Sequence, residues 1–66
     1  MLDSHEIGKR LRVLRGEKTQ KEVSKAVNIS ISALGMYENG KRVPRDEIKV
    51  ALAQYYGSTV EKLFFA

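Results

Sequence analysis

The chain has 66 residues, room for one small domain, and it contains no cysteine, so disulfides and thiolate zinc sites are excluded. Twelve Lys and Arg outnumber eight Asp and Glu, which gives a net charge of +4. The excess falls on residues 1–45, whose ten basic and five acidic side chains favour a polyanionic partner, with nucleic acid the first candidate. A solvated surface that keeps the domain soluble explains the same charge without any partner.

The first predicted helix begins after Asp3 or Ser4 and ends at Gly16, a residue that readily adopts the left-handed conformation found past helix ends. With Asp3 as the cap, Glu6 lies three residues on, close to a capping-box arrangement. The inward face of this helix is predicted to be an apolar stripe formed by Ile7, Leu11 and Leu14.

The second predicted helix begins with a full capping box, in which Thr19 and Glu22 occupy the Thr-x-x-Glu positions. Its apolar face is predicted to consist of Val23, Ala26 and Val27. Asn28 ends it, because asparagine tolerates the left-handed conformation of a tight turn. Ser30 caps a third helix, which the Asn-Gly pair at 39–40 ends. The inward residues of this third helix are predicted to be Ala33, Leu34 and Tyr37.

A basic loop follows at residues 41–45, where Pro44 forces an extended conformation on position 43. A fourth helix is predicted from about Asp46 to Tyr56, and Gly57 stops it. Its apolar face is predicted to be Ile48, Ala51, Leu52 and Tyr55. Thr59 caps a short last helix that carries Val60, Leu63 and Phe64. The predicted fold is therefore all-α: a compact five-helix bundle with a helix-turn-helix, in a single domain over residues 1–66.

The second and third helices are joined by a turn of about three residues, which is typical of a helix-turn-helix, here at about residues 19–39. This arrangement suits DNA, because the second helix of such a motif fits a major groove about 12 Å wide and presents its N-terminal residues to base edges. The first helix crosses the backbone, where its free N–H groups can bind phosphate.

Several motifs at this separation resemble the lambda repressor/Cro family, also called the xenobiotic-response-element (XRE) family. They are Thr-Gln-Lys-Glu-Val-Ser at 19–24, Ile-Ser at 29–30, Tyr-Glu-Asn-Gly-Lys at 37–41 with a downstream proline, and Val-Glu-Lys-Leu-Phe at 60–64. The similarity spans the chain from Ile7 to Phe64. The connection between Arg15 and Gln20 is shorter than the common family pattern, and Asn28 stands where many members have glycine.

The resemblance implies a role for each matching position. The positions that face the major groove are Ile31, Ser32 and Met36. The positions that contact phosphates are Thr19, Gln20, Asn39, Lys41, Arg42 and Arg45. Gln20 also braces the recognition helix, Arg45 can also reach the minor groove, and Arg15 with Glu38 forms a structural ion pair between the first and third helices. Without DNA, Gln20 is a helix-surface residue, Asn39 a C-cap, and the loop a solvated basic segment.

The groove-facing positions are unusually apolar. Ile31 and Met36 cannot make bidentate contacts to guanine or adenine, although they can pack on thymine methyl groups, and Ser32 can bond a base edge. Gly35 lies in mid-helix, where glycine costs about 1 kcal/mol relative to alanine. It allows close approach either to DNA or to a neighbouring helix. DNA shape is expected to supply part of the specificity.

A unit this small covers one half-site, and family members usually bind as symmetric dimers with half-sites about 34 Å apart. Residues 46–66 are the expected packing and dimerisation region, in which Phe65 is either frayed or part of the interface. The expected function is a sequence-specific, double-stranded-DNA-binding transcriptional regulator: a repressor of phage, plasmid or bacterial type, acting as a homodimer in the cytoplasm. The alternative is a protein-interaction module, such as an antitoxin-like regulator that uses the same surface.

Enzymatic, membrane and cofactor functions are not expected. No nucleophile has a positioned base, and Gly35-x₄-Gly40-Lys41 lacks both the Ser/Thr and the preceding strand of a P-loop. His5 stands alone without a carboxylate cluster, so no metal is expected. The apolar runs are too short for a signal peptide or a spanning helix. The expected partners are a double-stranded DNA operator and a second copy of the chain, without a small-molecule cofactor.

Overall fold

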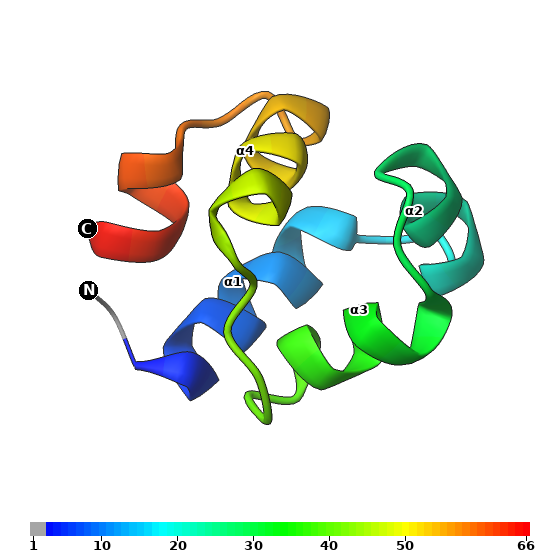
Figure 1. Ribbon diagram of the computed structural model, residues 1–66, viewed down its shortest axis with the longest axis horizontal. Coiled ribbons are helices and arrows are strands. Elements are labelled where there is room, and N and C mark those ends of the chain that lie inside the picture. The colour runs from blue at the N-terminus through cyan, green and yellow to red at the C-terminus, as the bar shows by residue number, and fades with distance from the viewer. Residues whose placement is uncertain (1–2) are drawn as a thin grey trace.

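The computed structural model describes residues 3–66, which form five helices. They are α1 (Ser4–Arg15), α2 (Gln20–Ala26), α3 (Ile31–Glu38), α4 (Asp46–Tyr55) and η1 (Glu61–Phe65), the last a π-helical turn. Residues 3–66 contain no strand, so the predicted all-α, five-helix fold is confirmed. Figure 1 shows α1 in the middle, α2 at the right, α3 at the lower right, α4 above α1 and η1 at the upper left. Among the helices described, none is both long and apolar enough to cross a membrane.

The first three helices begin at predicted capping residues. The side-chain oxygens of Asp3, Thr19 and Ser30 each accept the backbone N–H of the residue three positions on, at 2.9, 3.1 and 2.9 Å. At α2 the contact is reciprocal, because Glu22 accepts the Thr19 N–H and completes the capping box. These bonds satisfy donors that a helix start otherwise leaves unpaired, and they fix where α2 and α3 begin.

Three helices end in the same C-terminal motif. The residue that follows each cap is left-handed, with φ of 60° at Asn28, 74° at Gly40 and 65° at Gly57. The N–H of the residue after the left-handed one then donates a hydrogen bond to a carbonyl in the last turn of the helix. At the end of α2, for example, the Ile29 N–H donates to the Ser24 carbonyl at 2.9 Å, which is the Schellman arrangement. Asn28 therefore performs the role of glycine in the turn between α2 and α3, as the sequence predicts.

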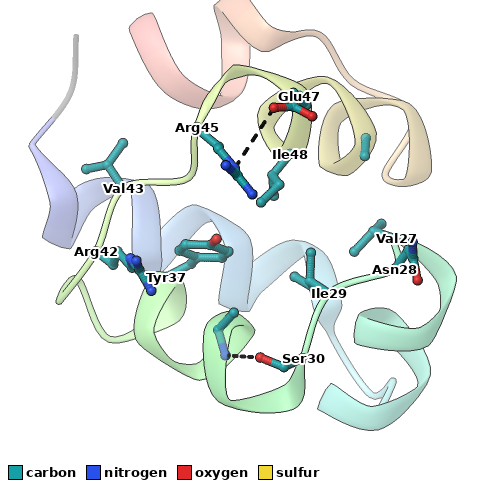
Figure 2. Close-up of a pocket in the computed structure, with 12 residues that line it drawn as sticks. Val27, Asn28, Ile29, Ser30, Tyr37, Arg42, Val43, Arg45, Glu47 and Ile48 are labelled. Carbon is teal, nitrogen blue, oxygen red and sulfur yellow. Dashed lines mark hydrogen bonds and ion pairs between the residues drawn. The ribbon is translucent and has the colours of Figure 1, made fainter.

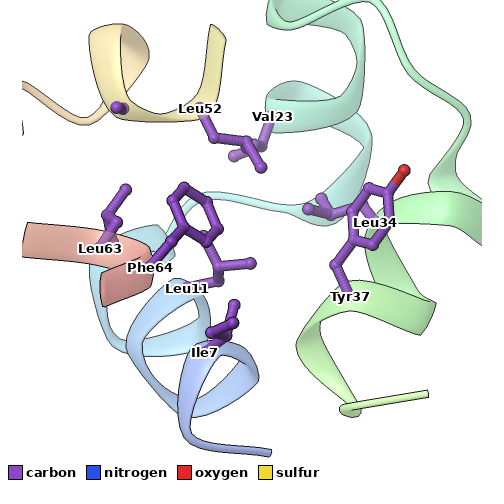
Figure 3. Packing of buried hydrophobic residues seen from close by; sticks show 9 residues of the cluster. Ile7, Leu11, Val23, Leu34, Tyr37, Leu52, Leu63 and Phe64 are labelled. Carbon is purple, nitrogen blue, oxygen red and sulfur yellow. The ribbon is translucent and has the colours of Figure 1, made fainter. Parts of the chain in front are cut away.

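The core draws side chains from every helix. The largest fully buried side chains belong to Phe64, Ile7, Leu11, Leu34, Leu52, Val23 and Pro44. Figure 3 shows Phe64 of η1 lying between Leu52 of α4 and Leu11 of α1, with Leu34 and Tyr37 of α3 on the far side of the cluster. η1 thus closes the core, and one side of α3 is anchored in it.

Two side chains that the sequence predicts to face inward, those of Leu14 and Ala26, are exposed in the structure. The expectation for Leu14 is wrong, because Leu14 is 39% exposed and Arg15 takes the next inward position after Leu11. The expectation for Ala26 is also wrong: Ala26 is exposed, and Ser24 is buried instead. At about 100° per residue, positions 24 and 26 lie about equally far from the side of Val23 and Val27, so helical spacing alone does not decide which of them is buried. The last residue of α4 is Tyr55 rather than Tyr56.

Candidate nucleic-acid interface

The outer surface of α3 carries three exposed side chains, those of Ile31, Ser32 and Met36. Ile31 is 48% exposed and Met36 is 40% exposed, so two apolar side chains of α3 lie at the surface. The opposite side of the helix buries Leu34, Tyr37 and Glu38. The core therefore holds α3 from one side and leaves the other side open to a partner.

A buried carboxylate joins α3 to α1 and to the start of α2. Glu38 accepts two bonds from Arg15, from Nε at 2.8 Å and from Nη2 at 3.1 Å, and a third from Gln20 Nε2 at 3.0 Å. The Glu38 side chain is 1% exposed and that of Arg15 is 20% exposed. Hydrogen bonding to this carboxylate raises the pKa of Arg15 above its ordinary value. The Glu38 carboxylate of α3 therefore links α1, through Arg15, and α2, through Gln20, to α3.

Gln20 and Thr19 lie at the start of α2, beside α3. The Gln20 amide nitrogen that binds Glu38 also lies near the outer side of α3, 3.9 Å from the place a Cβ on Gly35 would occupy. This contact holds Gln20 against α3. The Thr19 hydroxyl is engaged in the capping box, accepting from the Glu22 N–H and donating to its carboxylate at 3.4 Å.

Arg12 holds the C-terminal end of α3, a contact that the sequence reasoning missed. Its Nη2 donates to the Glu38 carbonyl at 3.1 Å and to Asn39 Oδ1 at 2.9 Å. An amide whose oxygen is held in this way presents its NH₂ group as a donor, which suits a phosphate oxygen. The sequence places Arg12 one helical turn beyond Gly8, but only the structure shows that this side of α1 faces α3.

The loop after α3 carries three exposed cations, Lys41, Arg42 and Arg45. Figure 2 shows Arg42 and Arg45 at the edge of a pocket of about 730 Å³ between α3 and α4. Arg45 Nε lies 4.0 Å from Glu47 Oε1, but the two side chains are 78% and 83% exposed, so water screens the pair. The guanidinium groups remain available to an anionic partner.

Tyr56, the C-cap of α4, adds a buried hydroxyl near the Arg15–Glu38 pair. The hydroxyl finds no hydrogen-bond partner among residues 3–66. Burial, reinforced by the negative charge of Glu38, raises the pKa of Tyr56 to about 12. An unfolded tyrosine ionises near pH 10, so the unfolded chain releases this proton first. The contribution of Tyr56 to stability is therefore complete below pH 10 and is lost as the pH rises toward 12.

We expect Tyr56→Phe to be at least as stable as the wild type at pH 7, because it removes an unpaired buried hydroxyl without removing the ring. Between pH 10 and 12 the wild type should lose more stability than the variant does. Thermal melts across this range measure the difference, with Tyr55→Phe as the control. Parallel pH profiles for wild type and Tyr56→Phe would contradict the expectation.

The fold and this surface together define a class of protein: a capped helix packs against a second helix, whose outer surface is exposed and flanked by polar and basic side chains. The chain matches the helix-turn-helix family over residues 9–63 and belongs to that family. Within it, the chain is of the lambda repressor/Cro-like (XRE) kind that its motifs resemble. It is a DNA-binding transcription regulator and not an enzyme.

Two solved structures are similar to the chain over nearly all its length. The restriction-modification controller protein C.AhdI from Aeromonas hydrophila has a TM-score of 0.81 and 27% identity, covering 91% of this chain and 94% of that one. The clp gene regulator ClgR from C. glutamicum has a TM-score of 0.79 and 25% identity, covering 96% of this chain and 84% of that one. No curated protein sequence matches the chain.

Proposed function

We propose that the chain is a sequence-specific repressor that places α3 in the major groove of an operator. The observation that carries this proposal is the exposed outer surface of α3, with polar and basic groups on both sides of it. Base edges would face Ile31, Ser32 and Met36. Backbone phosphates would meet Thr19, Gln20, Asn39, Lys41, Arg42 and Arg45. Both similar structures are those of proteins named as a controller or a gene regulator, which favours gene control.

We propose that the active form is a homodimer, in which each protomer binds one half-site and residues 46–66 form the contact. One protomer measures 27 Å along its longest axis, whereas half-sites on successive turns have centres about 34 Å apart. Phe65 is 45% exposed, and its ring lies 5.1 Å from the Lys49 ammonium group. η1 and α3 lie on opposite sides of the view in Figure 1, so a contact through Phe65 leaves α3 free for DNA.

Sedimentation of Phe65→Ser tests this contact. We expect the variant to sediment with half the mass of the wild type, because serine removes the apolar surface that the second protomer would cover. Val13→Ser is a matched control, since Val13 is also apolar and is 79% exposed on α1. The control should keep the wild-type mass. An unchanged mass for Phe65→Ser would place Phe65 outside the dimer contact.

Selection of bound sequences from a random duplex pool tests the proposed function. We expect enrichment of two inverted half-sites, with centres about 10 base pairs apart or a multiple of that distance. A single enriched half-site would support DNA binding and contradict the dimer. Binding to duplex DNA that enriches no sequence would contradict sequence-specific recognition.

The exposed apolar side chains of Ile31 and Met36 keep one other function open, a protein-interaction module that uses the same surface. The cations at residues 41–45 would have no phosphate partner in such a module. Failure to bind any duplex in the pool at low salt would favour this second function over the first.

A further inference from the structure

The outer surface of α3 offers a base edge very few polar groups. Successive helical residues are turned by about 100°, so Ile31, Ser32, Gly35 and Met36 share an arc of about 140°. Glu38, the one charged residue of α3, lies on the buried side. The Ser32 hydroxyl is therefore the single side-chain hydrogen-bonding group of this arc. The bidentate contacts that read guanine or adenine use Arg, Lys, Asn or Gln side chains, and α3 has none of these.

Gly35, near the centre of this arc, is not required by the packing of the chain. A Cβ at Gly35 would meet only Gln20 Nε2, at an ordinary contact distance of 3.9 Å, among the residues that the structure describes. Gly8 differs, because a Cβ there would lie 2.4 Å from a backbone oxygen. Gly40 differs too, because its φ is 74°. Glycine weakens a helix interior, so a requirement from outside the chain explains Gly35 better than the fold does.

We infer, on the basis of the proposed function, that the arc formed by Ile31, Ser32, Gly35 and Met36 reads the 5-methyl groups of thymine in the major groove. The thymine methyl is the one natural apolar group on a major-groove edge, and it suits the exposed side chains of Ile31 and Met36. The missing side chain of Gly35 lets the helix backbone approach the bases closely. Ser32 adds one hydrogen bond to a base edge.

Charge complementarity favours DNA over a protein as the partner that covers this apolar arc. Gln20 borders it through the contact near Gly35, and the cations of residues 41–45 follow the C-terminal end of α3. Groups of this kind suit phosphates on both sides of a groove. The operator is therefore expected to present thymines where α3 enters, and to tolerate guanine poorly there.

Two synthetic duplexes test the inference directly, alternating poly(dA-dT) and alternating poly(dA-dU), which differ only in the thymine methyl group. We expect the wild type to bind poly(dA-dT) more tightly, by about fourfold for each methyl group contacted. In the double variant Ile31→Ala/Met36→Ala, the preference should fall to about one. A third arm compares poly(dI-dC) with its 5-methylcytosine form, and the methylated form should bind more tightly by a similar factor.

The outcomes separate this inference from the proposed function. Binding of the wild type to neither polymer at low salt would overturn both and would favour a protein partner. Equal binding to poly(dA-dT) and poly(dA-dU) would overturn methyl reading and leave DNA binding intact. A preference that persists in the double variant would assign the effect to DNA shape rather than to Ile31 and Met36.

The variant Gly35→Ala gives a second readout, in which stability and affinity move in opposite directions. We expect its Tm to rise by about 4 °C, because alanine favours the helix and meets no close contact. Its affinity for poly(dA-dT) should fall at least about tenfold, because the new methyl keeps the helix away from the bases. A lower Tm, or an unchanged affinity, would overturn the role assigned to Gly35.

Discussion

Gly8→Ala is expected to destabilise the domain more than any other single-methyl addition on α1. A Cβ at position 8 would lie 2.4 Å from the Glu38 carbonyl oxygen and 2.8 Å from that of Tyr37, both backbone atoms that cannot move aside alone. α1 and α3 would have to separate. Overpacking of this kind costs about 3 kcal/mol, offset by about 1 kcal/mol of helix propensity. The net loss of about 2 kcal/mol corresponds to a fall in Tm of about 8–16 °C.

Gly35→Ala is the matched control for this measurement, because Gly35 is also a helix-interior glycine and a Cβ there would make only an ordinary contact, with Gln20 Nε2 at 3.9 Å. Its Tm should rise while that of Gly8→Ala falls. Equal melting temperatures for the two variants would contradict the close approach of α1 to α3. DNA binding should also weaken in Gly8→Ala at temperatures where the variant stays folded, because α3 is displaced from its place against α1.

The second large effect is expected for Glu38→Ala. The substitution leaves Arg15 without its carboxylate partner and removes the acceptor of the Gln20 amide. Removing one member of a buried pair costs about 3–5 kcal/mol when the other charge stays buried. Because the Arg15 side chain is 20% exposed and can reach water, we expect the lower end of that range, about 3 kcal/mol.

Glu61→Ala is the control for Glu38→Ala, since Glu61 is an exposed carboxylate of η1. Surface substitutions of this kind usually change stability by less than about 0.5 kcal/mol. Thermal melts of both variants give the comparison, and an equal loss of Tm would contradict a structural role for Glu38. Glu38→Gln separates charge from shape, because it keeps the side-chain volume while removing the ion pair with Arg15.

The sequence predicts most of the fold because the helix boundaries depend on local chemistry. Thr19 and Ser30 cap helices through their own hydroxyls, and Asn28 and Gly40 take the left-handed positions that end them. Each of these features involves residues within five positions of one another, so a pattern of neighbours is enough to find it. The boundary at Tyr55 depends on the same motif around Gly57.

The features that the sequence does not predict depend on how α1 crosses α3. The periodicity of α1 offers Leu14 and Arg15 equally well as the next inward residue after Leu11. Arg15 takes the place because its partner, Glu38, lies on α3, 23 residues away. The close approach at Gly8 and the contact of Arg12 with Asn39 arise from the same crossing. Patterns among residues that are neighbours in the sequence do not predict how closely two helices approach each other.

In the candidate site, too, some features are predicted by the sequence and others appear only in the structure. The family resemblance implies that Ile31, Ser32 and Met36 face the partner, and the structure has all three exposed on α3. The family resemblance implies that Gln20 braces the third helix, but the bond from Gln20 to Glu38 is not predicted, because no local rule brings the start of α2 to the end of α3. The sequence does not show that a Cβ at Gly35 would meet no close neighbour, since a glycine in mid-helix is equally consistent with an approach to DNA and with an approach to another helix.

The central claim is that α3 and the loop after it bind duplex DNA through phosphates as well as bases. The most direct test is the salt dependence of binding to a genomic DNA pool, for the wild type and for a variant with Lys41, Arg42 and Arg45 all changed to Gln. The wild type should bind at low salt and weaken steeply as salt rises. The slope of log K against log salt should be shallower in the variant by about 2–3, because three phosphate contacts are removed. The claim would be contradicted if the affinity of the wild type did not depend on salt concentration. It would also be contradicted if the slope were unchanged in a variant whose Tm equals that of the wild type.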